Sequence, residues 1–559
     1  MYRRRLITAL VAALALLPAL TACDPDKKGA SGTVNGMVAN LNLGGFTSNP
    51  NPQRVFNPYL PSTTLDTSYI FEPLFVVNGY NCKPEPWLGT SFSWDDPEHL
   101  SVTTRHGVTW SDGKSYSAKD VAFSFNLLKK VPAFDQAGVW ASLKSVEATG
   151  SDKVLFTFKH PSADSFTKIA NLVIVPEHVW STAKDPVKFT NPNGVGTGPF
   201  RYASFNSQQM VLKRNTRYWR ADKVKVAKLT FHNNGGGGDT DKLRLAQGQY
   251  DQNTMFVADI EKTFVSRDPK HNKYWFNSGG EISLYLNLTR APFNDTAFRH
   301  AIAYAVNRKE ISQKAEYGYV KPASQTGLVL PGQKSWLSDK YADGAVTGYD
   351  PARAKRMFTA AGYKYSDGKL LDKSGKPMAF TFDAPTGWLD WIQAANIVRE
   401  NLGKVGIDVD VRTADANNVQ NDRNIGHFDM QFGVHGGTCN MFQNFDEPLG
   451  SDKTAPIGKA AVPAGAGGNF VRWRDERTDQ LLEQLRSTTD VAQQKKIIAG
   501  LQDVFVQQIP VIPLWYGAQW YEYRTANAVG WPNKANPYAV INQPNNALLV
   551  ITRLQPAQG

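Results

Sequence analysis

Cysteine is scarce in this chain. Only Cys23, Cys82 and Cys439 occur among 559 residues. A zinc site takes about four ligands, which Cys82 and Cys439 do not supply, so we expect no metal site. The sequence alone does not show whether these two cysteines lie close enough to bond. A disulfide and two free thiols therefore both remain open.

Long apolar runs are also missing, apart from one short N-terminal segment. Residues 6–20 are apolar, follow three arginines and are too short to predict a membrane span. We therefore interpret residues 1–22 as a signal peptide. Its end, Leu20-Thr21-Ala22-Cys23, resembles the bacterial lipobox, in which the cysteine is lipidated.

This interpretation makes residues 23–32 a lipidated cysteine and a flexible tether. The body would then lie on the extracellular face of the bacterial cell membrane, attached to it by lipid only. A plain secretion signal followed by a chance cysteine is the alternative.

Concentrated positive charge is absent as well. Lys and Arg number 62 against 50 Asp and Glu, a net charge of +12, but the basic residues are spread thinly. Nucleic-acid binding usually needs a concentrated basic surface. We therefore expect no nucleic-acid partner.

Familiar catalytic signatures are missing too. The chain has no H-E-x-x-H and no G-x-S-x-G, and its Ser-x-x-Lys matches lack an accompanying K-T-G. Gly235–Gly238 is glycine-rich but is not followed by G-K-[ST], so it is not a phosphate-binding loop. These absences favour a protein that is not an enzyme and needs no cofactor.

What the body does contain is an alternation of strands and helices. Residues 282–288 alternate apolar and polar side chains as a strand does, and Asp295 is placed to cap a helix over 296–310. Farther on, 378–382, 388–402 and 407–411 have the periodicity of strand, helix and strand. This order predicts an α/β fold.

Several longer motifs follow one another along the body. The first three of these motifs together combine a strand, a tight Asp-Gly turn and a helix that begins with serine. The blocks are Leu88–Trp94, Arg105–Lys114, Tyr116–Phe125, Gly196–Phe200, Pro292–Asp295, Tyr349–Tyr363 and Ile509–Tyr516. In this order they resemble the family 5 extracellular solute-binding proteins of bacterial ABC importers. That family includes oligopeptide-, dipeptide-, nickel- and oligosaccharide-binding proteins.

The resemblance implies a two-lobed, periplasmic-binding-protein-like α/β fold with a hinge. Lobe I would cover residues 33–280, with an inserted subdomain around 75–190, and lobe II residues 281–510. Residues 511–559 would return to lobe I. The lobes would close on a ligand, and a monomer would deliver it to the permease and ATPase subunits of an importer.

The ligand class is the open question. The family's peptide binders carry an Asp shortly after a Phe-Asp strand, where it pairs with the peptide's α-ammonium. Here Phe428-Asp429 is followed by Met430 to Asn440 with no Asp. Residues 386–391 instead resemble the oligosaccharide-binding branch, because aromatic rings stack on sugars and Asp or Asn binds hydroxyls.

We therefore expect an oligosaccharide ligand, with an oligopeptide as the main alternative and a secreted hydrolase or surface adhesin as others. The expected contacts come from the start of the 388–402 helix, the loop after the Phe-Asp strand, the returning segment and an early loop. They are Trp388, Asp390 and Trp391; Gly436, Gly437 and Asn440; Trp515 and Trp520; and, from the early loop, Asn57 and Tyr59.

Overall fold

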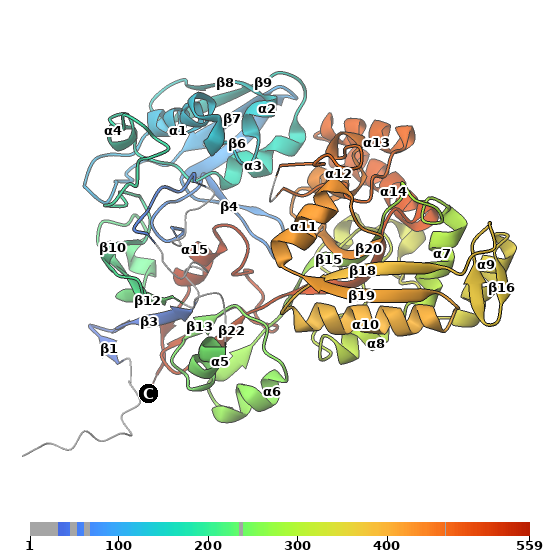
Figure 1. Ribbon diagram of the computed structural model, residues 1–559. Helices are drawn as coiled ribbons and strands as arrows, with labels where there is room; N and C mark the ends of the chain where they lie inside the picture. Colours follow the sequence, from blue (N-terminus) through green and yellow to red (C-terminus); the bar gives the residue numbers. More distant parts are fainter. Residues whose placement is uncertain (1–31, 45–52, 61–66, 234–238, 464–465, 559) are drawn as a thin grey trace, which may run out of the picture.

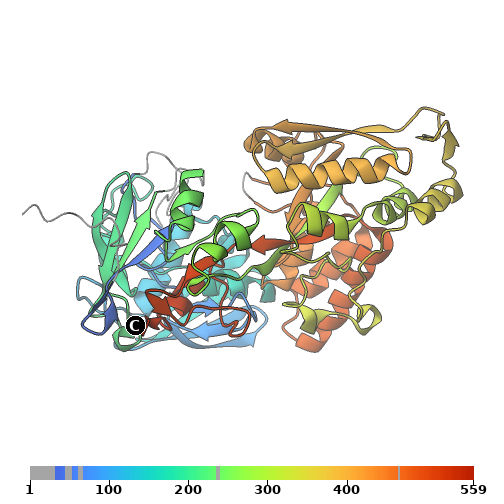
Figure 2. The ribbon, with the colours of Figure 1, turned by 90° about the horizontal axis from the view of Figure 1, so that it is seen from below.

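The computed structural model describes residues 32–44, 53–60, 67–233, 239–463 and 466–558. The expected signal peptide and Cys23 lie outside these ranges. Two bodies of the chain lie side by side and are joined by strands (Figure 2). We call them the first lobe and the second lobe.

The first lobe is built on two separate sheets. A seven-stranded sheet contains β3 (Leu41–Gly44) at its centre. Its order is β10 (Phe200–Phe205), β11 (Gln209–Arg214), β12 (Lys228–His232), β3, β13 (Gln252–Asn253), β22 (Glu522–Arg524) and β14 (Asn272–Tyr274). The other sheet is four-stranded, in the order β6 (Gly89–Asp96), β7 (His99–Thr104), β9 (Lys153–Phe158) and β8 (Leu143–Ala148).

Helix α1 (Ala118–Lys130) covers the four-stranded sheet and contacts β8 and β9. Ser117 starts it with a capping box, in which the Asp120 carboxylate accepts from the Ser117 backbone N–H at 2.9 Å. The motif read as strand, turn and capped helix is therefore confirmed.

The second lobe contains a mixed five-stranded sheet. Its order is β19 (Asp408–Ala414), β18 (Ala379–Pro385), β20 (Met430–His435), β15 (Asn277–Leu286) and β21 (Ile512–Gln519). Strand β18 is parallel to both β19 and β20, while β15 is antiparallel to β20 and β21. Helix α10 (Leu389–Gly403) connects β18 to β19, so the predicted strand–helix–strand unit is confirmed.

Some of the other helices of this lobe cover the sheet, and the rest form a separate helical group (Figure 1). They are α7 (Thr296–Ala305), α8 (Arg308–Lys314), α9 (Pro351–Ala360), α11 (Ala416–Ile425), α12 (Met441–Leu449), α13 (Glu476–Arg486) and α14 (Val491–Gln508).

One helix predicted from the sequence is two in the structure. The segment 296–310 divides into α7, capped by Asp295 as expected, and α8. Asn307 makes the division because its side chain accepts from the Glu310 backbone N–H at 3.1 Å and so caps a new helix.

The return to the first lobe comes later than residue 511. Strand β21 pairs with β15 in the second-lobe sheet, where Ile282 faces Trp515, and the chain enters the seven-stranded sheet only at Glu522. The buried residues Ile512–Tyr516 belong to the second-lobe core, which explains the later crossing.

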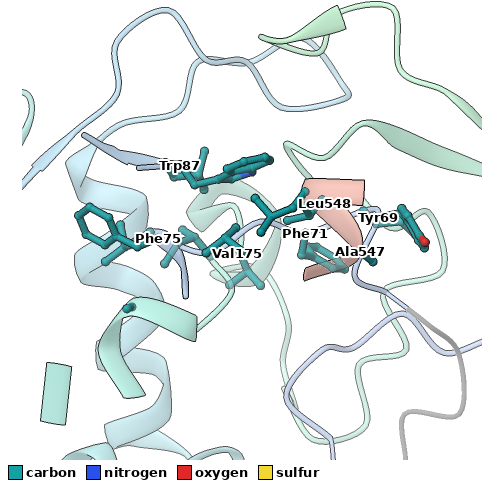
Figure 3. Close-up of a cluster of buried hydrophobic side chains, with 14 of the residues drawn as sticks. Tyr69, Phe71, Phe75, Trp87, Val175, Ala547 and Leu548 are labelled. Carbon is teal, nitrogen blue, oxygen red and sulfur yellow. The ribbon is translucent and has the colours of Figure 1, made fainter. Parts of the chain in front are cut away.

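The C-terminal segment completes the core of the first lobe. Helix α15 (Asn546–Ile551) places Ala547 and Leu548 beside Phe71 and Trp87, which come from the early part of the chain (Figure 3). No described helix is long and apolar enough to span a membrane.

A buried carboxyl organises the aromatic part of this core. Glu72 has no exposed surface and accepts hydrogen bonds from the indole N–H of Trp87, the Tyr218 hydroxyl at 2.9 Å and the Trp219 indole N–H. Burial raises the pKa of Glu72 from 4.5 to about 7, against the opposing effect of these donors.

We predict that Glu72 makes stability pH-dependent. Its folded-state pKa is raised, so its contribution is fully present below about pH 4.5 and is lost as the pH rises through about 7. The loss should be on the order of 3 kcal/mol. Denaturant unfolding at several pH values should show a slope in the wild type, a fall in the free energy of unfolding as the pH rises, that is absent in Glu72→Gln. Glu147→Gln, an exposed site on β8, is the control and should keep the slope.

Candidate functional site

The two lobes are joined by neighbouring segments of the chain. Between β14 and β15, the Trp275 backbone N–H donates to the carbonyl of Tyr521, at 3.0 Å, in the segment between β21 and β22. Within the second-lobe sheet, Asn277 then faces Gln519. The crossings are therefore hydrogen-bonded to each other and form one narrow connection, as a hinge requires.

Three pockets lie along this connection. A first-lobe pocket of about 300 Å³ lies at the end of β3, and an interlobe pocket of about 510 Å³ is lined by both lobes. A small crossing pocket shares Ile541 and Asn542 with the first and Trp275 with the second. The crossing pocket, of only about 10 Å³, therefore lies between the two larger ones.

The interlobe pocket is mainly aromatic, with charged residues at its wall. Its lining residues are Asp259, Glu261, Tyr274, Trp275, Phe276 and Lys534 from the first lobe and its connection, and Tyr317, Gly318 and Tyr319 from the second lobe. The rings of Tyr317 and Tyr319 stack with centroids 5.8 Å apart, and Tyr317 is 49% exposed. This pair is a surface on which a flat apolar face can stack.

Trp520 adjoins this pocket, as a residue of the crossing. Its ring centroid lies 4.8 Å from that of Phe276 and 6.2 Å from that of Tyr319. The structure therefore places the predicted Trp520 beside this pocket, while its aromatic neighbours were not predicted from the sequence. Those come from short segments without a motif, so only their aromatic composition could have indicated them.

Trp388, Asp390 and Trp391, the predicted contacts at the start of α10, differ in how far they are exposed. Trp388 is 40% exposed, and its ring lies 4.8 Å from that of Trp391. Trp391 is only 9% exposed and packs on Phe432, at 5.6 Å. Trp388 can thus contact a ligand, whereas Trp391 holds the Trp388 ring in place.

Two carboxyls lie behind these rings. Glu316 is buried, and burial raises its pKa to about 8, with the nearby Asp390 adding to the rise and the donating Trp515 indole opposing it. Burial also raises the pKa of Asp390. Glu316 thus belongs to the buried support of this region, and neither carboxyl lines the interlobe pocket.

Trp515 itself is not a contact residue. It is 1% exposed and lies in the second-lobe core, where its ring packs 5.1 Å from that of Phe432. The expectation that Trp515 touches the ligand is wrong, because β21 belongs to the second-lobe sheet and turns this side chain into the core.

Asn57 and Tyr59 are also structural. Both are buried in the first lobe: Asn57 donates to the carbonyls of Pro186 and Phe189, and the Tyr59 hydroxyl donates to that of Val173 at 2.8 Å. Their polar groups bond to the backbone of neighbouring loops. The prediction that Asn57 and Tyr59 contact the ligand is therefore corrected.

The loop after β20 reaches the first lobe. Gly437 has a φ of +73°, and an added Cβ would lie 2.9 Å from Gly280, so this close approach needs glycine. Gly436, with a φ of +70°, makes the same turn. The Asn444 side chain fixes the loop by accepting from the Gly437 N–H at 2.9 Å.

Asn440, at the end of this loop, already has partners on both sides. Its amide donates to the carbonyl of Asp164 in the first lobe, at 2.8 Å, and its side-chain oxygen caps α12. It therefore joins the lobes, which corrects its assignment as a free ligand contact. Next to it, Cys439 forms a disulfide with Cys82, which settles the pairing that the sequence left open.

Among the described residues, no group of three or more His, Cys, Asp or Glu is arranged to hold a metal ion.

Residues 83–455 match the sequence model of the middle region of the bacterial extracellular solute-binding proteins, family 5. The chain belongs to this family. Family 5 solute-binding proteins are non-enzymatic substrate-binding components of ABC importers that work outside the cytoplasm, so the hydrolase alternative is excluded.

Solved structures of similar proteins confirm the two-lobed α/β fold. A periplasmic oligopeptide-binding protein of an ABC transporter from Thermotoga maritima is 26% identical, with a TM-score of 0.83 over 92% of this chain and 99% of that chain. The same protein with mannohexaose bound gives 25% identity and a TM-score of 0.76, over 94% and 100%.

Among characterised sequences, this family 5 protein is 21% identical to the peptide transport periplasmic protein SapA of Salmonella typhimurium, over 93% of this chain and 94% of that protein. It is 23% identical to the oligopeptide-binding protein AppA of Bacillus subtilis, over 74% and 75%.

We predict unequal losses of stability for two tryptophans of the second lobe. Trp515→Ala should lower the free energy of unfolding by about 3–5 kcal/mol because the side chain is buried. Trp388→Ala should lower it by less than about 1 kcal/mol, since its ring is partly exposed. Denaturant titration checks both. Equal losses would contradict the division into core and surface residues.

Proposed function

We propose that this protein captures an oligosaccharide between its lobes and delivers it to the permease of an ABC importer. The observation that carries the proposal is the interlobe pocket, where aromatic rings from both lobes stand beside carboxylates. Sugar rings present apolar C–H faces for stacking and hydroxyls for hydrogen bonds to acceptors such as Asp259 and Glu261. The mannohexaose-bound relative supports a ligand of this class.

The presence of two larger pockets, one on each side of the crossing, further supports an oligomeric ligand over a single sugar. The first-lobe pocket at the far end is lined by amides and hydroxyls, including Gln252, Thr254 and Gln543. Such groups bind hydroxyls without needing a charge on the ligand. We propose that one end of the ligand lies between the lobes and the other extends toward β3.

An oligopeptide is the second candidate, and one observation favours it. Asp390 lies two residues after the exposed Trp388, and its carboxylate would suit the α-ammonium of a peptide. The names of SapA and AppA refer to peptides as well. A thermal-shift assay with both sugars and peptides separates the two candidates.

We also propose where and with whom the protein works. Lipidation at Cys23, after removal of residues 1–22, would attach a monomer to the extracellular face of the cell membrane. The partners would be the permease and ATPase subunits of the importer.

We predict that the protein binds oligosaccharides. Mannohexaose and other di- to hexasaccharides should be tested beside di- to pentapeptides in a thermal-shift assay, because a ligand that binds only the folded state raises the melting temperature. A shift with one sugar series and none with peptides is expected. A shift with peptides alone would contradict the sugar proposal and leave the transport role intact.

The same assay identifies the stacking residues. Trp388→Ala and Tyr317→Ala should each weaken binding of the active sugar by about 3- to 15-fold, corresponding to the loss of one stacking contact. Trp94→Ala, in the four-stranded sheet of the first lobe, is the matched control and should leave the affinity unchanged. Trp391→Ala is unsuitable because Trp391 is buried in the second-lobe core.

A further inference from the structure

A disulfide joins the two lobes beside the strands that cross between them. Cys82 lies in the turn between β4 (Phe75–Val77) and β5 (Pro84–Pro86) of the first lobe, and Cys439 lies in the loop after β20 of the second lobe. Their Cα atoms are 5.1 Å apart across a sequence separation of 357 residues. The lobes therefore have a third covalent connection besides the two crossings.

The first-lobe end of this bond is firmly held. The backbone carbonyl of Asn78 accepts from the Cys82 backbone N–H at 2.8 Å. The Asn78 side chain donates to the Glu85 carboxylate and to the carbonyl of Tyr538. The Gly79 N–H donates to the Asn546 side chain at the start of α15. Because α15 lies in the first-lobe core (Figure 3), Cys82 moves only with that lobe.

The second-lobe end is equally fixed. Gln333 donates to the carbonyl of Thr438 at 2.9 Å and to Asn444 at 3.1 Å, and Asn444 donates to Gly327. Cys439 is therefore part of a braced loop, and the disulfide joins two rigid bodies without a slack segment at either end.

Further contacts between the lobes surround the bond. Asn440 donates to the carbonyl of Asp164, and both α12 and α13 contact the short helix Ala163–Ser165 of the first lobe. Figure 1 shows α12 beside the first-lobe region that contains α3 and β4. Hinge opening would separate these surfaces, and a covalent bond between them restricts that movement.

We propose that the Cys82–Cys439 disulfide is a clasp that limits how far the lobes separate. The bonded protein opens only slightly and exchanges its ligand on the side of the interlobe pocket. After reduction the crossings act as a free hinge. In that step a dithiol breaks the S–S bond, Cys82 and Cys439 each gain a hydrogen, and the dithiol is oxidised to its own disulfide. Disulfides persist outside the cell, where this clasp would stay closed.

The inference rests on the two-lobed fold and does not need the sugar proposal, so its test uses no ligand. The full chain with Cys23→Ser, secreted from a bacterial host, contains no thiols except Cys82 and Cys439. Small-angle X-ray scattering would compare it untreated, reduced with dithiothreitol, and with Cys82→Ser and Cys439→Ser added. We expect a radius of gyration near 24 Å for the bonded form and roughly 1 Å more for the other two. Dithiothreitol should not change the variant.

Three outcomes would overturn the clasp. The first is the same scattering from all three samples, and the second is two free thiols in the untreated protein by mass spectrometry. The third is unfolding of both the reduced protein and the variant, seen by circular dichroism, which would show that the bond is required for folding. If only the variant fails to fold, the comparison of scattering between the untreated and the reduced protein decides whether the bond limits opening.

Discussion

The narrow connection between the lobes determines what the rest of the structure can do. Trp275 and Tyr521 pair where the chain crosses, and β15 and β21 continue this pairing into the second-lobe sheet. Two crossings that are hydrogen-bonded to each other bend as one unit, so each lobe keeps its own core when their relative position changes. A ligand bound between the lobes would contact residues on both sides of this connection.

The chemistry beside the connection fits a neutral ligand with many hydroxyls. Aromatic rings dominate the interlobe pocket, and its acidic residues are partly offset by Lys534. Asp259 and Glu261 can accept hydrogen bonds from sugar hydroxyls, and Lys534 can donate to them.

Local patterns predicted the elements better than they predicted the site. The capping residues Ser117 and Asp295 start helices as expected, and α10 connects two parallel strands. Asn307 divided one predicted helix because its side chain caps the backbone, a competition that the apolar periodicity does not reveal.

Site predictions failed where burial depends on distant parts of the chain. Trp515, Asn57 and Tyr59 have side chains suited to ligand contact, yet each is buried by packing from other elements. Trp388 stays partly exposed because it precedes a helix, and Trp520 adjoins the interlobe pocket because it lies in a crossing segment. Tyr317 and Tyr319, and the bond between Cys82 and Cys439, depend on tertiary contacts that no local pattern contains.

One ligand is expected to contact both lobes at their connection. Hydrogen–deuterium exchange of the protein, with and without the sugar that gives the largest thermal shift, tests it directly. Protection is expected in both 274–276 and 317–319, with further protection at 388–391. Protection confined to one lobe, or to surfaces away from these segments, would contradict the account.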